Sequence, residues 1–213
     1  MAKRNYGQFC GLAHAADLVG ERWALLIIRD LLVSAKRFTD LRRGLPRIPT
    51  NVLSARLKQL EADGVIERRV LPRPEGSVVY SLTDYGHDLE PIVHALGRWG
   101  ARSMGEPKPD DIVTPDSLVI AMRSTFQPDV AAALTASWEL RAGPAVIHVK
   151  IDEGKLTTDV GELPDADLTI ETGPAIKALM AGELTAEQAI EAGHVRLEGN
   201  PALLTTFAEV FRI

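Results

Sequence analysis

Cysteine is almost absent from this 213-residue sequence, which contains Cys10 and no other. A single cysteine excludes an internal disulfide and any zinc site built from clustered cysteines. Long hydrophobic runs are absent as well, since the run Ala24–Ile28 lies between Arg22 and Arg29. A membrane-spanning helix needs roughly 20 apolar residues. The sequence therefore predicts a protein without a membrane span.

Targeting and catalytic motifs are also missing. The first residues lead into no apolar segment with a small-residue cleavage site, so no secretory signal peptide is expected. The sequence has no phosphate-binding glycine loop, no HExxH helix, no nucleophile elbow and no cluster of metal ligands. We therefore expect a cytoplasmic protein that is not an enzyme and that uses no metal or cofactor.

Charge is distributed unevenly, although the formal net charge is only −5. Residues 1–105 carry 16 basic and 11 acidic side chains, whereas residues 106–213 carry 8 and 18. The excess of positive charge is concentrated in residues 36–73, with 10 basic and 4 acidic side chains. This asymmetry predicts a polyanion-binding module joined to one that does not bind polyanions. Chance variation on two solvated surfaces is the alternative.

A polar segment with two prolines, residues 106–112, has the composition of a semi-rigid linker. It predicts two domains, residues 1–105 and residues 113–213. Together they predict an α+β protein, in which a winged helix-turn-helix domain precedes a two-layer α/β domain.

The first domain has the element order of a winged helix. Apolar periodicity and turn residues predict helices over 12–33, 38–44 and 50–63 and strands over 65–71 and 77–82. A turn containing prolines separates the second helix from the third, as in a helix-turn-helix. The strands form a hairpin that carries arginines, and a basic hairpin after a helix-turn-helix is the wing that lies beside the DNA backbone.

The helix over 50–63 is the predicted recognition helix. Leu53, Leu57 and Leu60 share a stripe that would face the core. The opposite face carries short polar side chains and a lysine, which suit close approach to the major groove. An ordinary solvated helix face is the alternative, and the basic hairpin favours DNA binding. The residues predicted to contact DNA are Arg37, Arg47, Thr50, Asn51, Ser54, Lys58 and Arg73.

Arginines of the predicted hairpin have more than one interpretation. Arg68 or Arg69 can pair with Glu67 or Glu61, which would give them a structural role. Arg73 stands at the tip of the hairpin, where no core is near, so phosphate or minor-groove contact is favoured.

A long apolar stripe follows the hairpin, on a helix predicted from Asp84 to about Met104 with Thr83 as its cap. A small domain cannot cover such a stripe alone. We therefore predict a homodimer interface with the N-terminal helix of a partner chain. Packing against the second domain of the same chain is the alternative. The stripe consists of Leu89, Ile92, Val93, Leu96 and Trp99.

Residues 6–103 resemble the HxlR-type winged-helix transcription regulators, a MarR-like class. The resemblance is carried by Phe9-Cys10, Gly20–Trp23, Leu26–Leu31, Arg37–Leu41, Ile48, Leu53-Ser54, Leu57, Leu60-Glu61, Gly64, Val79–Thr83, Gly86 and Leu89. It implies a dimeric bacterial or archaeal regulator that binds a pseudo-palindromic operator, with residues 50–58 as the recognition helix and the hairpin around Arg73 as the wing. Pro49 departs from the family, which usually has a small polar cap there, and this leaves the start of the recognition helix open.

Cys10 has a separate interpretation through the same resemblance. Some HxlR-type proteins sense oxidants or electrophiles through a cysteine at this position. A sensor thiol needs a lowered pKa and access to solvent, which Lys3, Arg4 or a helix N-terminus can promote. A buried, inert cysteine is the alternative.

The second domain has the pattern of a half-buried sheet with helices. Period-2 alternation predicts strands over 134–140, 145–151, 155–160, 167–171 and 194–198. In the second of these, Ile147, Val149 and Ile151 would face inward. Helices are predicted over 117–126, 174–180, 186–192 and 201–211.

This domain resembles the sterol-carrier-protein type 2 fold, most clearly in its last fifty residues. The resemblance is carried by Asp165–Ile170, Leu179–Gly182, Ala189, Gly193, Val195–Asn200, Leu203-Leu204 and Phe207. It implies an apolar tunnel for an acyl chain, sterol or related lipid. The tunnel candidates are Met122, Phe126, Trp138, Leu179, Met180, Phe207 and Phe211. A plain hydrophobic core is the alternative for each of them.

Taken together, the sequence predicts a homodimeric bacterial regulator that binds operator DNA through a winged helix and responds to an apolar ligand in its C-terminal domain. Two alternatives remain. One is a thiol redox regulator acting through Cys10, and the other is a lipid-binding carrier that uses the winged helix only to dimerise.

Overall fold

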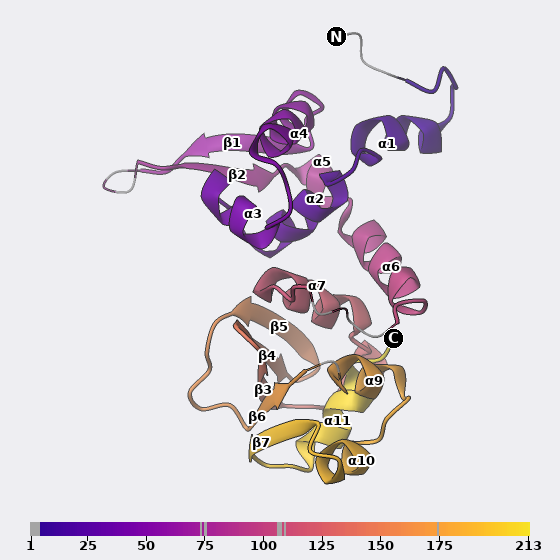
Figure 1. The fold of residues 1–213 in the computed structure, drawn as a ribbon, viewed down its shortest axis with the longest axis vertical. Coiled ribbons are helices and arrows are strands. Elements are labelled where there is room, and N and C mark those ends of the chain that lie inside the picture. The colour runs from indigo at the N-terminus through magenta and orange to yellow at the C-terminus, as the bar shows by residue number, and fades with distance from the viewer. Residues whose placement is uncertain (1–4, 73, 75, 106–107, 109, 174) are drawn as a thin grey trace. The chain divides into compact units, whose positions relative to one another are not determined.

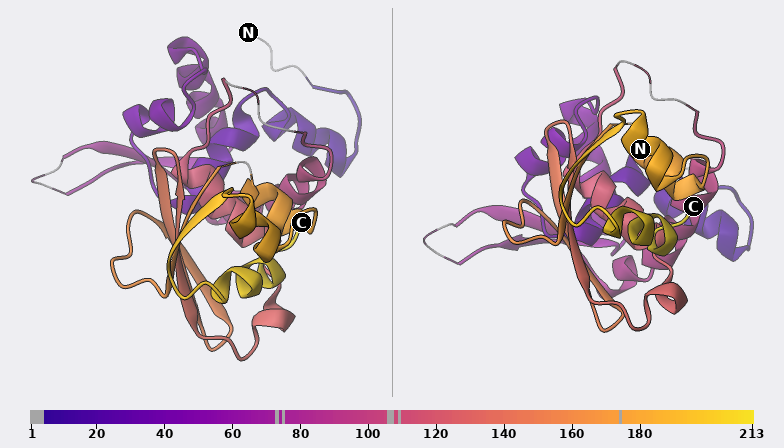
Figure 2. Two further views of the ribbon diagram at one scale, coloured as in Figure 1. Left: turned by 60° about the horizontal axis from the view of Figure 1, so that its bottom comes forward. Right: turned by 90° about the horizontal axis from the view of Figure 1, so that it is seen from below.

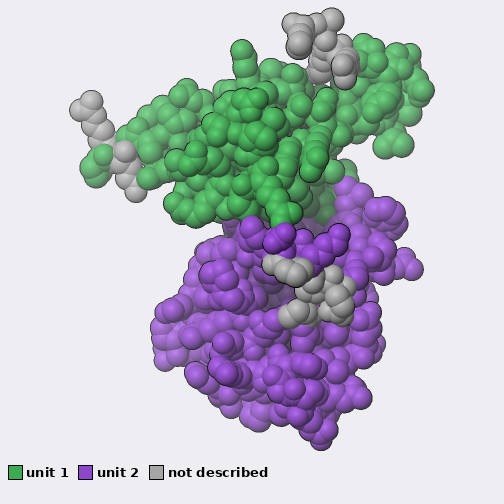
Figure 3. Space-filling view, viewed as in Figure 1, with its two compact units in different colours: residues 1–93 green, residues 94–213 purple. Residues whose placement is uncertain are grey.

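The computed structural model of the chain describes residues 5–72, 74, 76–105, 108, 110–173 and 175–213. The chain divides into two compact units, residues 1–93 and 94–213 (Figure 3). Helices and strands occur in both units, which confirms the predicted α+β class. The boundary between the units falls between Val93 and His94, inside a helix, whereas the sequence predicts a linker at 106–112. Of that linker, residues 106, 107 and 109 lie outside the described residues.

The N-terminal unit contains most of the helices expected from the sequence (Figure 1). Its elements are α1 (Gly11–Val19), α2 (Ala24–Val33), α3 (Phe38–Gly44), α4 (Thr50–Ala62), β1 (Ile66–Val70), β2 (Val78–Leu82), α5 (Asp84–His87) and the start of α6 (Glu90–Ala101). Strands β1 and β2 form the antiparallel hairpin that was predicted, in the register Ile66 to Leu82 and Val70 to Val78.

Two helices predicted as continuous are broken. The helix expected over 12–33 is interrupted between α1 and α2, where Trp23 has a φ of 80° and Arg22 lies 5.4 Å from its ring centroid. A residue in the left-handed backbone region cannot continue a right-handed α-helix, so the chain turns at Trp23. The helix expected from Asp84 to Met104 is divided into α5 and α6 before Pro91, which has no amide hydrogen to extend the preceding turn.

A compact apolar core holds the N-terminal unit together. Helices α2 and α3 pack on β2, and α4 packs on β1. Lys36 extends the hairpin by exchanging backbone hydrogen bonds of 2.9 and 2.8 Å with Tyr80. Gly86 permits α5 to approach the hairpin, because a Cβ there would lie 2.1 Å from the Val65 carbonyl oxygen. The fully buried side chains include Ile27, Ile28, Leu41, Leu53, Leu57 and Leu60.

The C-terminal unit is a five-stranded sheet with helices. Its strands lie in the order β5-β4-β3-β6-β7, and all neighbours are antiparallel except β3 and β6. Figure 2 shows α9, α10 and α11 gathered on one side of this sheet. The elements are α7 (Pro115–Thr125), α8 (Pro128–Ala131), β3 (Ala136–Ala142), β4 (Ala145–Asp152), β5 (Lys155–Val160), β6 (Leu168–Thr172), α9 (Ala175–Ala181), α10 (Ala186–Glu191), β7 (Val195–Gly199) and α11 (Leu203–Val210).

The alternation predicted for the strand over 145–151 is confirmed in β4. Ile147, Val149 and Ile151 of β4 are buried, and Lys150 is exposed. In β3 the alternation predicted over 134–140 fails at Glu139, which is buried although its neighbours Trp138 and Leu140 are buried too. Its carboxylate accepts hydrogen bonds from Arg141 and from the backbone N–H of Leu163. The hydrogen bond and the charge of Glu139 raise the pKa of Arg141. This carboxylate therefore ties the loop between β5 and β6 to the sheet.

Candidate functional site

Helix α4 has the two faces that its sequence predicts. Leu53, Leu57 and Leu60 are buried against the unit. The helix begins at Thr50, directly after the extended Pro49, so the departure from the family pattern does not shift its start. The opposite face is exposed and carries Thr50, Asn51, Ser54, Ala55 and Lys58. A solvated face of short polar side chains leaves the helix free to approach a base edge.

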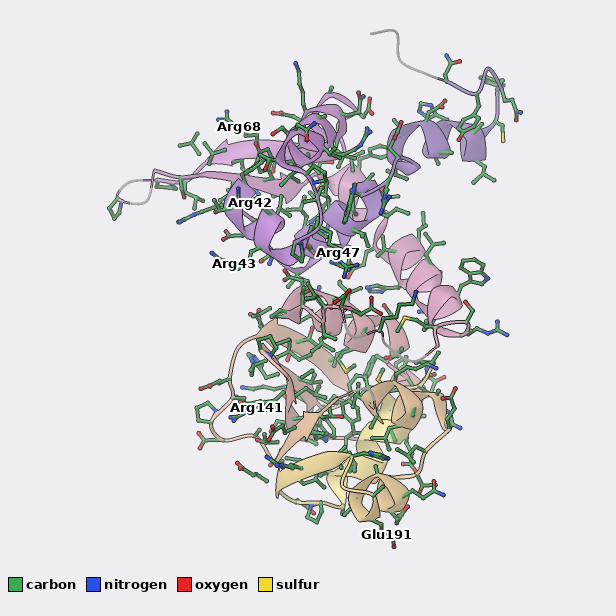
Figure 4. All side chains as sticks on the ribbon, viewed as in Figure 1. Arg42, Arg43, Arg47, Arg68, Arg141 and Glu191 are labelled. Atoms are coloured by element: carbon green, nitrogen blue, oxygen red, sulfur yellow. The ribbon has the colours of Figure 1, made fainter. Side chains whose placement is uncertain are left out.

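Two buried side chains hold the turn between α3 and α4 in place. Leu45 and Ile48 are buried, and the backbone N–H of Ile48 donates to the Leu45 carbonyl at 2.9 Å. Basic side chains surround this turn on the outside: Arg42 and Arg43 are exposed on α3 and Arg47 is exposed in the turn itself (Figure 4). The rigid turn therefore presents positive charge next to the start of α4.

The arginines of the hairpin lie in different surroundings. Arg69 forms an ion pair with Glu67 at 3.0 Å and donates to the Ser81 hydroxyl, so the structural interpretation is confirmed for this residue. Arg68 is exposed on the other face of β1 (Figure 4). Arg73, the predicted tip contact, lies outside the described residues. Arg37 is exposed just before α3.

The apolar stripe on α6 is divided between core and surface. Val93 is buried and Leu89 is half-buried. Ile92, Leu96 and Trp99 have exposed fractions of 51%, 44% and 72%. The second half of α6 packs on α7 by its other side, because Arg98 donates from Nη1 to the Ser124 carbonyl at 2.6 Å. The exposed stripe therefore does not pack within the described chain.

Helix α1 shows a similar lack of burial. None of its residues is buried, although most of them are apolar. Phe9 and Leu12 are among the most exposed large apolar side chains of the described chain. Phe9 is among the residues that carry the family resemblance, and Leu12 begins the N-terminal helix that was predicted to contact a partner chain, but neither was named as an interface residue.

Cys10 is exposed and immediately precedes α1. Hydrogen bonds from the backbone N–H groups of Ala13 and Leu12 lower the pKa of its thiol. This arrangement is the one in which the N-terminus of a helix stabilises a thiolate. The alternative of a buried, inert cysteine is wrong for this structure.

The seven predicted tunnel residues meet in the interior of the C-terminal unit. The Trp138 ring lies 6.0 Å from Phe207 and 6.3 Å from Phe211, and Phe207 lies 4.9 Å from Phe211. Trp138 donates to the Leu203 carbonyl at 3.1 Å. Phe126 is half-buried, and the other six are buried. These aromatic residues contact one another closely, as expected of a packed core.

A cavity of about 580 Å³ that is open to solvent lies elsewhere in the same unit, and Arg98, Val130, Glu209 and Arg212 of its lining are exposed. None of the seven tunnel candidates lines it. Its lining is Arg98, Gln127, Val130, Glu209, Arg212 and Ile213. Because these residues are scattered over the sequence, no spacing or motif identifies them, and sequence reasoning missed them.

The residues that the structure describes lack two kinds of feature. They contain no group of three or more His, Cys, Asp or Glu side chains arranged to hold a metal ion. Within the same residues, no helix combines the length and the apolar character required to cross a bilayer.

Comparison with known families divides the chain in two. Residues 18–108 match the HxlR-like helix-turn-helix family, and residues 127–212 match the SCP-2 sterol transfer family. Both resemblances inferred from the sequence are thus confirmed.

Curated relatives match the N-terminal part. The uncharacterised HTH-type transcriptional regulator YvaP of Bacillus subtilis is 41% identical over 85 residues, which are 40% of this chain and 79% of YvaP. The uncharacterised HTH-type transcriptional regulator sll1512 of Synechocystis is 36% identical over 45% of this chain and 70% of its own length. Among solved structures, the redox regulator HypR in its oxidised form is 34% identical, with a TM-score of 0.43 over 45% of this chain and 99% of HypR.

Proposed function

The chain belongs to the HxlR-like helix-turn-helix family of transcription regulators, and we propose that it binds double-stranded operator DNA through α4 and the β1–β2 hairpin. The observation that carries this proposal is the exposed face of α4. Its short side chains, including Asn51 and Ser54, allow the helix to enter the major groove. The arginines around the turn from α3 supply the phosphate contacts that position the helix.

The proposal is tested with duplexes that the wild-type protein selects from a random-sequence pool. Fluorescence anisotropy at several salt concentrations then measures the affinity of each variant. Asn51→Ala removes a base contact and should cost about 1–3 kcal/mol with relaxed preference at one position. Lys58→Ala removes a phosphate contact, so it should weaken all sequences equally and lower the salt slope by roughly one.

A matched control for these variants is Lys150→Ala, which removes an exposed lysine from β4 in the other unit. It should leave affinity and salt slope unchanged. Unaltered binding of the Asn51→Ala, Lys58→Ala double variant would contradict the assignment of α4 as the recognition helix.

We further propose that the protein acts as a homodimer through α6 and α1. Ile92, Leu96 and Trp99 form an exposed apolar stripe on α6, and α1 has no buried residue. Apolar helix surfaces of this kind are stabilised when a second copy covers them. A two-fold arrangement would place two copies of α4 about 34 Å apart on one face of the DNA.

The C-terminal unit is proposed to modulate DNA binding through a small ligand. Membership of residues 127–212 in the SCP-2 sterol transfer family supports a ligand-binding role. Helix α6 supports communication, because its first residues belong to one unit and its remaining residues to the other. Ligand binding in one unit therefore acts on a helix that continues into the other unit.

A second candidate function is thiol sensing through Cys10. The observation in its favour is an exposed cysteine whose pKa is lowered by the first backbone N–H groups of α1. Because α1 is also part of the proposed dimer interface, modification of this thiol would act on assembly. N-ethylmaleimide adds to a single thiolate without a second thiol, so treatment with it should weaken operator binding of the wild type and leave Cys10→Ser unaffected.

A further inference from the structure

The cavity of the C-terminal unit is formed by segments that lie far apart in the sequence. Arg98 comes from α6, Gln127 and Val130 from the start of α8, Glu209 from α11, and Arg212 from the segment after it. All of them belong to the C-terminal unit. A volume of about 580 Å³ is within the range that small-molecule pockets occupy.

The backbone around the cavity is held by several hydrogen bonds. The N–H of Gln127 donates to the Val210 carbonyl at 2.8 Å, and the N–H of Arg212 donates to the Thr125 carbonyl at 2.9 Å. The Gln127 side chain donates to the carbonyls of Thr125 and Arg212. These bonds hold the backbone of the segments from which Gln127 and Arg212 project.

Positive charge dominates this lining, which has two guanidinium groups and one carboxylate. Arg98 is positioned by its 2.6 Å bond to Ser124, near the C-terminal end of α7, where a cation is favoured. A guanidinium has five N–H donors, and this bond uses one nitrogen. Within the described chain, Arg212 and Glu209 form no side-chain ion pair or hydrogen bond.

The Arg212 guanidinium also has a defined place. A Cβ at Gly182 would lie 3.0 Å from its Nη2 atom, so the absence of a side chain at Gly182 gives the guanidinium room. Gly182 has a φ of 70° after the end of α9, a conformation that favours glycine for the turn as well.

We propose that this cavity binds a small organic anion, with its carboxylate or phosphate held by Arg98 and Arg212 and its aliphatic part against Val130 and Ile213. Guanidinium groups match both oxyanions, since each can offer parallel N–H donors. The mode of recognition differs from that of an apolar tunnel, because the charged end of the ligand and not its apolar chain provides the recognition. The site is separate from the packed aromatic core around Trp138.

Arg98 connects the site to the DNA-binding unit, because it lies on α6, which begins in that unit. Arg98 lies on α6, the same helix that carries the exposed Leu96 and Trp99. An anion that binds Arg98 therefore acts on the helix proposed to form the dimer. This step rests on the proposed function, whereas binding of the anion itself does not.

Binding is tested by calorimetry on the full-length protein after removal of bound lipid. The probes are octanoate, octyl phosphate and the neutral octan-1-ol, which share one chain length and differ in head group. We expect octanoate or octyl phosphate to bind at least about tenfold more tightly than octan-1-ol. The stronger of the two anions identifies the preferred oxyanion.

Substitutions in the lining provide tests of opposite sign. Arg98→Gln and Arg212→Gln should each weaken anion binding by about tenfold, because each removes a charged donor. Glu209→Gln should strengthen binding, because it removes the carboxylate that repels the anion. Arg196→Gln is the matched control: it removes an exposed arginine from β7 in the same unit and should change nothing. Circular dichroism melting confirms that each variant is folded.

Two results would overturn the proposal. One is octan-1-ol binding as tightly as the anions, and the other is anion binding that is absent or unaffected by Arg98→Gln and Arg212→Gln. The proposed effect on DNA binding fails separately, if the anion binds at this site but leaves operator affinity unchanged in the anisotropy assay. Conversely, an operator response to either anion that persists in both arginine variants would support ligand modulation and reject this site.

Discussion

At the scale of single residues, Cys10 has the most testable chemistry. Because backbone hydrogen bonds stabilise its thiolate, the lowered pKa should shift its reactivity to lower pH. The rate of alkylation by iodoacetamide, followed by mass spectrometry, should rise with pH and reach half its maximum below the midpoint for glutathione. In urea the hydrogen bonds are lost, so the midpoint should move up. A native midpoint equal to or above that of glutathione would contradict a role for the helix N-terminus.

Phe207 tests whether the interior of the C-terminal unit is packed or hollow. Its ring is fully buried against Trp138 and Phe211, so Phe207→Ala should cost about 3–5 kcal/mol of unfolding free energy by leaving a cavity. Urea unfolding followed by tryptophan fluorescence measures the loss. Thr205→Ala, at an exposed position of the same helix, is the control. A cost below about 1 kcal/mol would indicate a hollow interior, and it would favour the tunnel over a plain core.

At the scale of elements, the exposed apolar stripe on α6 predicts that the protein is a homodimer. Leu96→Glu places a charge in the proposed interface and should give monomers with much weaker operator binding, because burial of an unpaired carboxylate is unfavourable. Sedimentation velocity at micromolar concentration measures the change. Ile190→Glu is closely matched, since Ile190 is 45% exposed on α10 and Leu96 is 44% exposed on α6. A monomeric wild type, or a dimeric Leu96→Glu, would reject the interface.

The elements also show what a sequence can predict. Helix α4 and strand β4 were predicted because one apolar face repeats with the period of each structure. The break at Trp23 was missed because apolar periodicity continues across it, and a tryptophan gives no signal for a positive φ. The cavity was missed for a different reason. It depends on contacts between segments distant in sequence, such as the bond from Arg98 to Ser124, and no local pattern encodes these.

At the scale of the whole molecule, the two units should be separable in function. Deletion of residues 110–213 should leave a dimer that binds the operator, since α4, the hairpin and all of α6 are retained. It should abolish the response to a ligand of the second unit, a coupling that typically amounts to about 1–3 kcal/mol. Anisotropy with and without the effector measures both properties. A truncated protein that still responds would place the sensor in the first unit, and Cys10→Ser would then be the decisive variant.

The division of α6 between the two units bears on how such a chain arose. YvaP is matched over 79% of its length by the N-terminal part alone, which leaves no room in it for a second module of this size. In a protein of that kind, the helix side equivalent to Gly97 and Arg98 has no α7 to meet. Here Arg98 donates to the Ser124 carbonyl at 2.6 Å. In a chain that carries both modules, α6 therefore makes a contact that a regulator with one module cannot make. Arginine at position 98 should consequently accompany α7 in regulators with both modules and vary freely in regulators with one.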